Sequence, residues 1–310
     1  MKLVITATLI VVVVTLIAGA AALWARRNPL LAFEKMTRSQ LKRGGMQRNE
    51  IVVSGEPVVY WTAGETGTTV VLVHGVNDQA GTWAGIGARL AKQNRVVAID
   101  LPGHGESGPK KGALPMRNMI DALAAVVNLN SPDEPVILVG NSMGGWVSML
   151  YASEKPERVR RLVLENASGM AWDLSHVPIA PRDRDEARRL LRMVQGPNAP
   201  LPDYLLDAMV RIAPDLPQAR VLQQPDLAQW LVDSRLAALT MPVALIWGRQ
   251  DGLLPQRYAE TLRSRLPDAT LELIDHAAHI PHRQVPAEFS RLLLAALAIE
   301  PAAMVESGHV

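Results

Sequence analysis

Short apolar runs rich in Val, Ile and Leu recur along the chain after residue 48, bounded by Gly, Pro, Asn and Asp. Such runs predict β-strands. They lie at residues 50–55, 57–62, 68–75, 95–103, 135–142, 158–166, 242–248 and 269–275. Three of them have an unbroken apolar centre, as in strands buried on both faces, at residues 70–73, 136–139 and 243–246.

Between these runs the apolar residues stand three and four positions apart, which is the spacing of helices. The pattern is present at residues 83–92, at residues 116–127 and from Met143 onward. The alternation of strand and helix predicts an α/β fold with a mostly parallel, eight-stranded sheet flanked by helices.

This alternation stops between about residues 171 and 238. No strand pattern occurs there, and residues 185–194 and 203–213 have helical spacing instead. We therefore expect a helical cap inserted in one folded domain, which runs over residues 49–300 and is followed by a short C-terminal tail at 301–310.

An uncharged, apolar segment precedes the folded domain at residues 3–24. As a helix it would extend roughly 33 Å at about 1.5 Å per residue, enough to span a bilayer core. The alternative is a cleaved signal peptide followed by export, for which the small residues 18–22 offer cleavage sites. The segment is longer than a signal core of about 7 to 15 residues, and its positive charge lies mainly after it, which favours a retained transmembrane anchor.

The flank after this segment, residues 25–48, holds seven Lys or Arg, whereas only Lys2 precedes it. Because positively charged flanks remain cytoplasmic, this asymmetry predicts a domain that faces the cytoplasm. Four of the basic residues fit one face of a juxtamembrane helix that touches anionic lipid, namely Lys35, Arg38, Lys42 and Arg43. A solvated basic linker is the alternative.

Composition narrows the range of functions. The net charge of +2 comes from the N-terminus, because the residues after 48 contain 24 basic and 29 acidic side chains, a net charge of −5. A basic footprint for nucleic acid is therefore missing. The absence of cysteine excludes disulfides and thiolate chemistry. The histidines lack metal-ligand spacing and no dinucleotide-binding fingerprint occurs, so neither a metal nor a cofactor is expected.

Residues 140–144 read Gly-Asn-Ser-Met-Gly, directly after a predicted buried strand and before a helix. This is the G-x-S-x-G nucleophile elbow in the strand-turn-helix context that it requires. The glycines have a steric reason, since a sharp turn that lifts the serine hydroxyl crowds its neighbours. Ser142 is the predicted nucleophile.

The predicted acid is Asp251, which follows the strand at 242–248. His279 follows the next strand, so the order is Ser, Asp, His. In that arrangement the histidine takes the proton of the serine and the aspartate orients the histidine. Alternatives remain open: Glu165 and Asp173 as reserve acids, and His276 and His282 as competing bases.

The loop after the strand at 68–75 carries Val76. In this kind of site one oxyanion donor comes from that loop and one from the residue after the nucleophile. We therefore assign the backbone N–H groups of Val76 and Met143. His74 is interpreted as structural, and the Gly-rich turn at 100–108 as a loop that supports the site.

Several motifs together resemble the α/β-hydrolase superfamily over about residues 50–300: VHGVND, DLPGHGESG, GNSMGG, WGRQD and AAHIPHRQVP. The resemblance implies the same fold, the same serine-hydrolase roles for Ser142, Asp251 and His279, and the oxyanion donors Val76 and Met143. Ala278 departs from the glycine usual before the family's histidine, which keeps His276 in competition. The segment 180–210 resembles the cap of membrane-anchored monoacylglycerol lipases and related bacterial lipases.

The leading functional hypothesis is carboxylic ester hydrolysis through an acyl-enzyme, with a small-molecule ester or lipid as substrate. Hydrolysis of a carbon–carbon bond is an alternative, because GNSMGG also resembles the elbow of ring-cleavage-product hydrolases. Acyl transfer and a non-catalytic binding protein on the same fold are the others. Leu and Met residues of the cap favour single-chain esters with about eight or more acyl carbons.

Overall fold

The computed structural model describes the backbone of residues 2–298 and the side chains of residues 15–298; the predicted tail at 301–310 lies outside the described residues. Its centre is one eight-stranded sheet in the order β1-β2-β4-β3-β5-β6-β7-β8. The pairs β1–β2 and β2–β4 are antiparallel, and the other five pairs of neighbouring strands are parallel. The strands are β1 (Gln47–Val53), β2 (Glu56–Ala63), β3 (Thr69–Val73), β4 (Arg95–Ile99), β5 (Val136–Asn141), β6 (Val159–Glu165), β7 (Val243–Gly248) and β8 (Ala269–Ile274). The predicted mostly parallel, eight-stranded sheet is confirmed.

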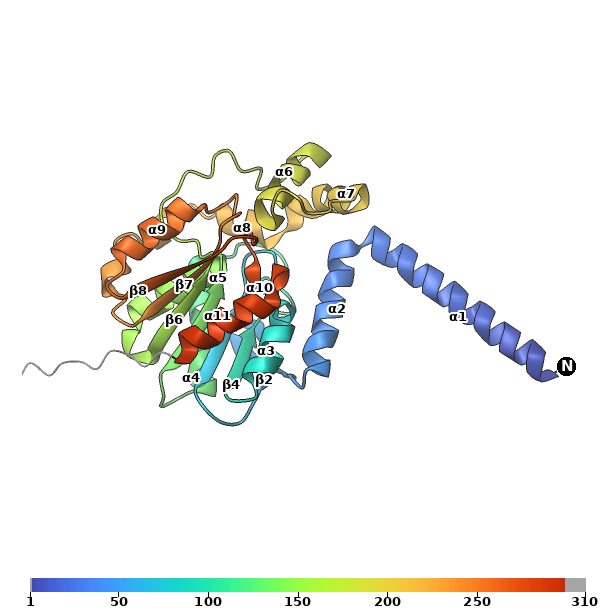
Figure 1. Cartoon of the computed structure of the whole chain (residues 1–310), viewed down its shortest axis with the longest axis horizontal. Helices are drawn as coiled ribbons and strands as arrows, with labels where there is room; N and C mark the ends of the chain where they lie inside the picture. The colour runs from blue at the N-terminus through green and yellow to red at the C-terminus, as the bar shows by residue number, and fades with distance from the viewer. Residues whose placement is uncertain (1, 299–310) are drawn as a thin grey trace, which may run out of the picture.

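Helices cover both faces of the sheet (Figure 1). Successive side chains of a strand point to opposite faces, so an unbroken apolar run fills both. In β3, Val71 and Val73 pack toward one face and Val70 and Leu72 toward the other. The first face is covered by α4 (Met116–Asn130), α5 (Met143–Glu154) and α9 (Gln256–Arg265). The second is covered by α3 (Ala84–Leu90) and α11 (Pro286–Ala298).

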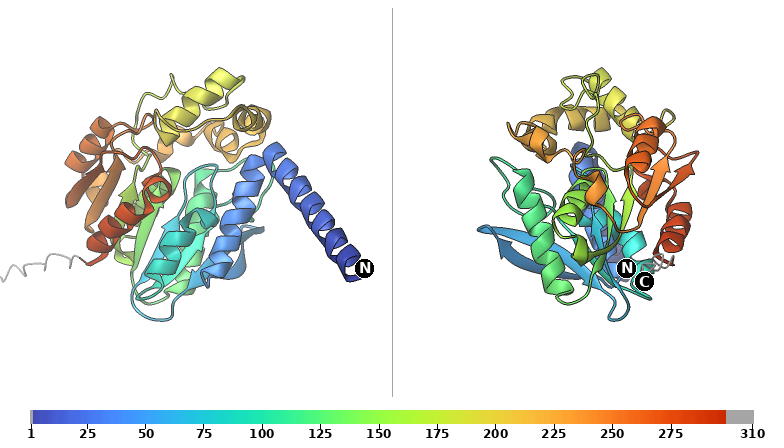
Figure 2. Two further views of the ribbon diagram at one scale, coloured as in Figure 1. Left: turned by 45° about the vertical axis from the view of Figure 1, so that its right-hand side comes forward. Right: turned by 90° about the vertical axis from the view of Figure 1, so that its left-hand side faces the viewer.

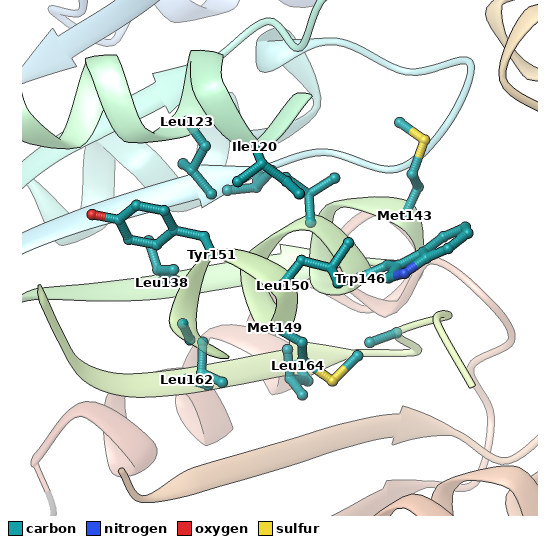
Figure 3. Close-up of a cluster of buried hydrophobic side chains, with 14 of the residues drawn as sticks. Ile120, Leu123, Leu138, Met143, Trp146, Met149, Leu150, Tyr151, Leu162 and Leu164 are labelled. Atoms are coloured by element: carbon teal, nitrogen blue, oxygen red, sulfur yellow. The ribbon is translucent and has the colours of Figure 1, made fainter. Parts of the chain in front are cut away.

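Helix α5 starts directly after β5 and is buried on every side, with ten of its twelve residues buried. Figure 3 shows its side chains Trp146, Leu150 and Tyr151 between leucines of the central strands and residues Ile120 and Leu123 of α4. A helix that is apolar all round needs such a position. Truncating one of these side chains to alanine would lower the free energy of unfolding by about 2–5 kcal/mol. The N-terminus of α5 therefore starts from a tightly packed helix.

The cap lies between β6 and β7 and contains α6 (Arg184–Gln195), α7 (Asp203–Ile212) and α8 (Pro217–Leu222). Figures 1 and 2 show α6 and α7 above the end of the sheet. The carboxylate of Asp183 caps α6 by accepting the N–H groups of Asp185 and Glu186 at 2.9 and 2.8 Å. Gly196, with φ of +91°, ends the helix. These helices lie in the region, about residues 171–238, for which the sequence predicts a helical cap.

Two helices precede the sheet. Helix α1 (Lys2–Arg27) extends away from the folded domain (Figures 1 and 2). Helix α2 (Pro29–Arg43) packs against that domain and buries Thr37 and Leu41. Among the residues described with side chains, no helix is long and apolar enough to cross a membrane. Residues 3–14, the first part of the predicted span, have side chains outside that described region.

The basic flank is partly folded onto the domain. Arg38 is only 17% exposed and contacts Glu34 and, at 3.3 Å, Glu106. Lys35, Lys42 and Arg43 are exposed. The four basic residues therefore do not share one free face, because Arg38 is turned toward carboxylates of the protein.

Candidate active site

Ser142 occupies a sharp turn between β5 and α5, with φ of +51° and ψ of −119°. An L-residue seldom adopts this left-handed region, so the surrounding structure must hold it there. Glycines make the turn possible, since a Cβ on Gly140 would lie 2.6 Å from the backbone of Gly144, and one on Gly144 only 2.2 Å from the carbonyl oxygen of Val73. The geometry is that of a nucleophile elbow.

Hydrogen bonds to neighbouring segments hold this turn in place. The N–H of Ser142 donates to the carbonyl oxygen of Glu165 at the end of β6, at 3.0 Å. The buried side-chain amide of Asn141 donates to the carbonyl oxygens of Glu165 and His279, at 3.3 and 3.1 Å. The residue before the serine thus connects three segments that are distant in sequence.

The structure brings Ser142, His279 and Asp251 into one hydrogen-bonded row. Ser142 Oγ lies 2.9 Å from His279 Nε2, and His279 Nδ1 lies 2.7 Å from Asp251 Oδ2. The side chains of His279 and Asp251 are 7% and 0% exposed. Since the carboxylate only accepts, Nδ1 carries a proton and donates it, which leaves Nε2 of the neutral ring free to accept the serine proton.

Besides His279, three donors fix the carboxylate of Asp251. The N–H groups of Leu253 and Leu254 donate to Oδ1 at 2.8 and 3.0 Å, and Asn166 Nδ2 donates to Oδ2 at 2.6 Å. Asn166 has a left-handed φ of +42°, and its own Oδ1 accepts the N–H of Gly248 at 3.0 Å. The sequence interpretation missed Asn166, although an Asn directly after a strand is a residue type that tolerates this conformation.

The electrostatics favour a basic imidazole. Burial lowers the pKa of His279, but the charge and hydrogen bond of Asp251 and the charge of Glu165 outweigh this effect. The net result is a pKa above the usual value of 6.5. A raised pKa means a stronger proton acceptor toward the serine hydroxyl.

The competing residues lie elsewhere. His276 is exposed and pairs with Glu288 at 3.0 Å. Asp173 is exposed and accepts the N–H of Ser175. Glu165 is buried, but its carboxylate contacts His282, with Nδ1 of that ring 2.8 Å from Oε2. Of the three histidines, only His279 contacts both Ser142 and Asp251 among the described residues.

The loop that carries Val76 lies against the elbow. A Cβ on the preceding Gly75 would lie 3.2 Å from Ser142 Cβ. Asn77, with φ of +60°, exchanges two hydrogen bonds with Gln218 of α8, at 2.6 and 2.9 Å. Met143 is the first residue of α5, where backbone N–H groups lack intrahelical acceptors.

The Gly-rich turn at 100–108 buttresses that loop. The carboxylate of Asp100 accepts the N–H groups of Ala80 and Glu106 at 2.6 and 2.8 Å, and His74 Nε2 accepts the N–H of Leu101 at 3.0 Å. Burial, with the neighbouring His74 as a further cause, lowers the pKa of His104 to about 3, so this ring is neutral. Both histidines have structural contacts here.

The cap touches the site directly. The N–H of His279 donates to the carbonyl oxygen of Val194 at 3.1 Å, and the N–H of Gly252 to that of Met193 at 3.0 Å. The end of α6 therefore contacts the loops that carry the imidazole and the carboxylate. Within the described part of the chain, no cluster of three or more His, Asp or Glu could hold a metal ion.

The chain belongs to the alpha/beta hydrolase family, whose model matches residues 70–292. It is 30% identical to the pimeloyl-[acyl-carrier protein] methyl ester esterase of Proteus mirabilis over 258 residues, which cover 76% of this chain and 95% of that protein. The crystal structure of a membrane phospholipase A, a bacterial virulence factor, has a TM-score of 0.74 at 25% identity, over 93% of this chain and 97% of that one. A meta-cleavage product hydrolase of Pseudomonas fluorescens shares the fold, with a TM-score of 0.67 at 23% identity over 80% and 97% of the two chains. The protein is thus a hydrolase of this superfamily, as the sequence motifs predicted.

Proposed function

We propose that the protein hydrolyses carboxylic esters, with Ser142 as nucleophile, His279 as general base and Asp251 as the acid that orients it. The observation that carries this proposal is the continuous row from Ser142 Oγ through His279 to Asp251, at 2.9 and 2.7 Å. The esterase and phospholipase among its relatives support an ester substrate.

In the first half of the reaction, Ser142 Oγ attacks the ester carbonyl carbon while its proton passes to His279 Nε2. The resulting imidazolium is stabilised by the Asp251 carboxylate. The carbonyl oxygen becomes an oxyanion, for which the N–H groups of Val76 and Met143 are the proposed donors. His279 then gives its proton to the alkoxide, and the alcohol leaves an acyl group on Ser142.

In the second half, water replaces the alcohol. It loses a proton to His279 as it attacks the acyl carbon, and the proton then returns to Ser142 Oγ as the carboxylic acid departs. The hydrogen bonds that hold Asp251 and the elbow pre-organise this geometry. The groups that stabilise the imidazolium and the oxyanion are therefore in position when these charges develop.

The test is hydrolysis of an ester panel by the full chain beside its Ser142→Ala variant. We expect turnover by the wild type and none above background by the variant. Turnover of equal rate by both proteins would refute the assignment of the nucleophile, and a wild type that cleaves no member of the panel would refute ester hydrolysis.

We further propose that residues 3–24 anchor the protein in a membrane, with the hydrolase domain on the cytoplasmic side. The uncharged stretch and its basic trailing flank support this. The juxtamembrane region also contacts the cap: Leu30 packs against the cap core, and Arg211 of α7 donates to the carbonyl oxygen of Arg27 at 2.7 Å. An anchor of this kind would keep the cap close to lipid esters.

Membrane fractionation tests the anchor. The full chain should stay with membranes after a carbonate wash, whereas a chain that starts at Asn28 should be released with α2 intact. A chain that starts at Gly45 should be less stable, because it lacks the buried Thr37 and Leu41. Recovery of a native protein that begins near Ala21 would instead show a cleaved signal peptide.

A further inference from the structure

A second buried pair of imidazole and carboxylate lies beside the proposed triad. Glu165 and His282 have side chains that are 0% exposed. The carboxylate of Glu165 accepts the backbone N–H of His282 at 2.6 Å and its ring Nδ1–H at 2.8 Å. On the other side of the ring, Nε2 lies 2.7 Å from the hydroxyl of Thr82, and Trp83 stacks on the ring at 4.3 Å.

This pair connects the two segments that must meet for catalysis. His282 comes three residues after His279, in the short helix α10 (Pro281–Gln284). Glu165 ends β6, and its own carbonyl oxygen accepts the N–H of Ser142 at 3.0 Å. One residue thus binds the nucleophile turn through its main chain and the loop of His279 through its side chain.

Asn166, the residue after Glu165, provides a second connection to His279. Asn166 holds Asp251 at 2.6 Å, so the end of β6 reaches His279 from two directions, through Asp251 and through His282. A buried carboxylate is costly unless its acceptors are satisfied, and an apolar pair could fill the same space. Shape alone therefore does not account for this pair.

We propose that Glu165 and His282 are positioning residues, which hold the loop of His279 at the distance from Ser142 that proton transfer requires. The inference rests on the proposed function. Loss of the pair would let the loop shift, and a displacement of about 1 Å can cost about 100-fold in rate.

The experiment compares variants of the full chain that remove or preserve this contact. Glu165→Met keeps the volume and removes the acceptors. Glu165→Gln is the conservative rescue, because its amide can still bind His282 if the ring shifts its proton to Nε2 toward Thr82. His282→Phe keeps a ring on Trp83 and the backbone contact with Glu165, but removes Nδ1. His276→Phe, three residues on the other side of His279, is the matched control because His276 is 63% exposed.

The readout is the second-order rate of Ser142 labelling by a fluorophosphonate, per folded protein, together with kcat and KM for a cleaved ester. We expect E165M and H282F to lose about 10- to 100-fold in labelling rate and kcat with KM unchanged. E165Q should recover most of that loss and H276F should match the wild type. Should E165M not fold, H282F carries the same test.

Two results would overturn the inference: labelling of E165M and H282F at the wild-type rate with only a lower melting temperature, or an equal loss in H276F and H282F. Failure of the proposed function looks different, because the wild type would be labelled at Ser142 yet cleave no ester. The labelling rates would still measure the positioning effect in that case.

Discussion

The end of the sheet and the cap above it are built in opposite ways. At the sheet end, Asn141, Glu165, Asn166 and Asp251 are buried, and each binds another segment of the site. In the cap, α6 and α7 are joined by a small apolar cluster and by exposed ion pairs of Arg184 with aspartates of α7. Exposed pairs of this kind contribute little to stability.

This difference suits the sheet end to positioning the site residues and the cap to binding the substrate. Buried polar groups that are hydrogen-bonded in a network make one another rigid, so the sheet end holds the three residues of the proposed triad in place. Apolar packing in the cap tolerates changes of side chain more easily. Substitutions at the sheet end should therefore act on kcat, and those in the cap on the choice of substrate.

The largest effect is expected for Ser142→Ala. Loss of the nucleophile should lower kcat by about a millionfold, to the background set by the remaining groups. Labelling by a fluorophosphonate should disappear, while the circular dichroism spectrum and melting temperature stay close to those of the wild type. Labelling of the alanine variant at the wild-type level would exclude Ser142 as nucleophile.

His279→Ala should cost nearly as much, because a serine without its base is a poor nucleophile. His276→Ala should stay near wild-type activity, since His276 is exposed and contacts Glu288 rather than the serine. Steady-state kinetics of both variants on one ester show which histidine is the base. If His276→Ala is the inactive variant, His276 and not His279 is the base.

Asp251→Asn should lower kcat by about 10⁴-fold, because an amide can present the wrong partner to Nδ1 and no longer stabilises the imidazolium. The fold should persist, since the amide oxygen can still accept the N–H groups of Leu253 and Leu254. Kinetics and thermal melting of the same sample check both statements. Activity within tenfold of the wild type would move the role of the acid to another residue.

A smaller effect is expected in the cap. Leu190, Leu191, Leu206 and Met209 pack on one another, whereas Met193 is half-buried against the acid loop, its Cβ 3.0 Å from where a Cβ on Gly252 would lie. If the cap binds an acyl chain, each added methylene should raise kcat/KM by about fourfold over the first several carbons. Met193→Ala should flatten that dependence, measured with esters of two to twelve acyl carbons. A maximum at acetate would refute a lipid substrate.

The pH dependence of kcat/KM reports on the charged groups around His279. His279 must be neutral to accept a proton, so kcat/KM should fall as the pH drops through its pKa, with a midpoint above 6.5 because that pKa is raised. Glu165→Gln removes one of the charges that raise it, so the midpoint should move to lower pH while Asp251 keeps the larger part. A midpoint that does not move would show that the charge of Glu165 does not reach the imidazole.

Much of this was predictable from local sequence. Apolar runs such as 136–139 are typical of strands buried on both faces, and a Gly-Asn-Ser-Met-Gly turn after such a strand predicts a nucleophile elbow. The roles of Ser142, Asp251 and His279 were predicted from their order along the chain and from their places at the ends of the predicted strands 135–142, 242–248 and 269–275. Helical spacing at residues 185–194 and 203–213 predicted α6 and α7, whereas no such pattern was found for α8.

Only the tertiary structure decided which polar groups meet. His276, His279 and His282 are each three residues apart and chemically identical, and Glu165 was only a reserve acid on sequence grounds. The path of the chain after β8 places one imidazole at Ser142, one in solvent and one on Glu165. Hydrogen bonds reach only about 3 Å, so such pairings depend on how strands far apart in sequence are aligned. The local sequence determines which positions are buried, whereas contacts between single polar atoms form only once the sheet has been assembled.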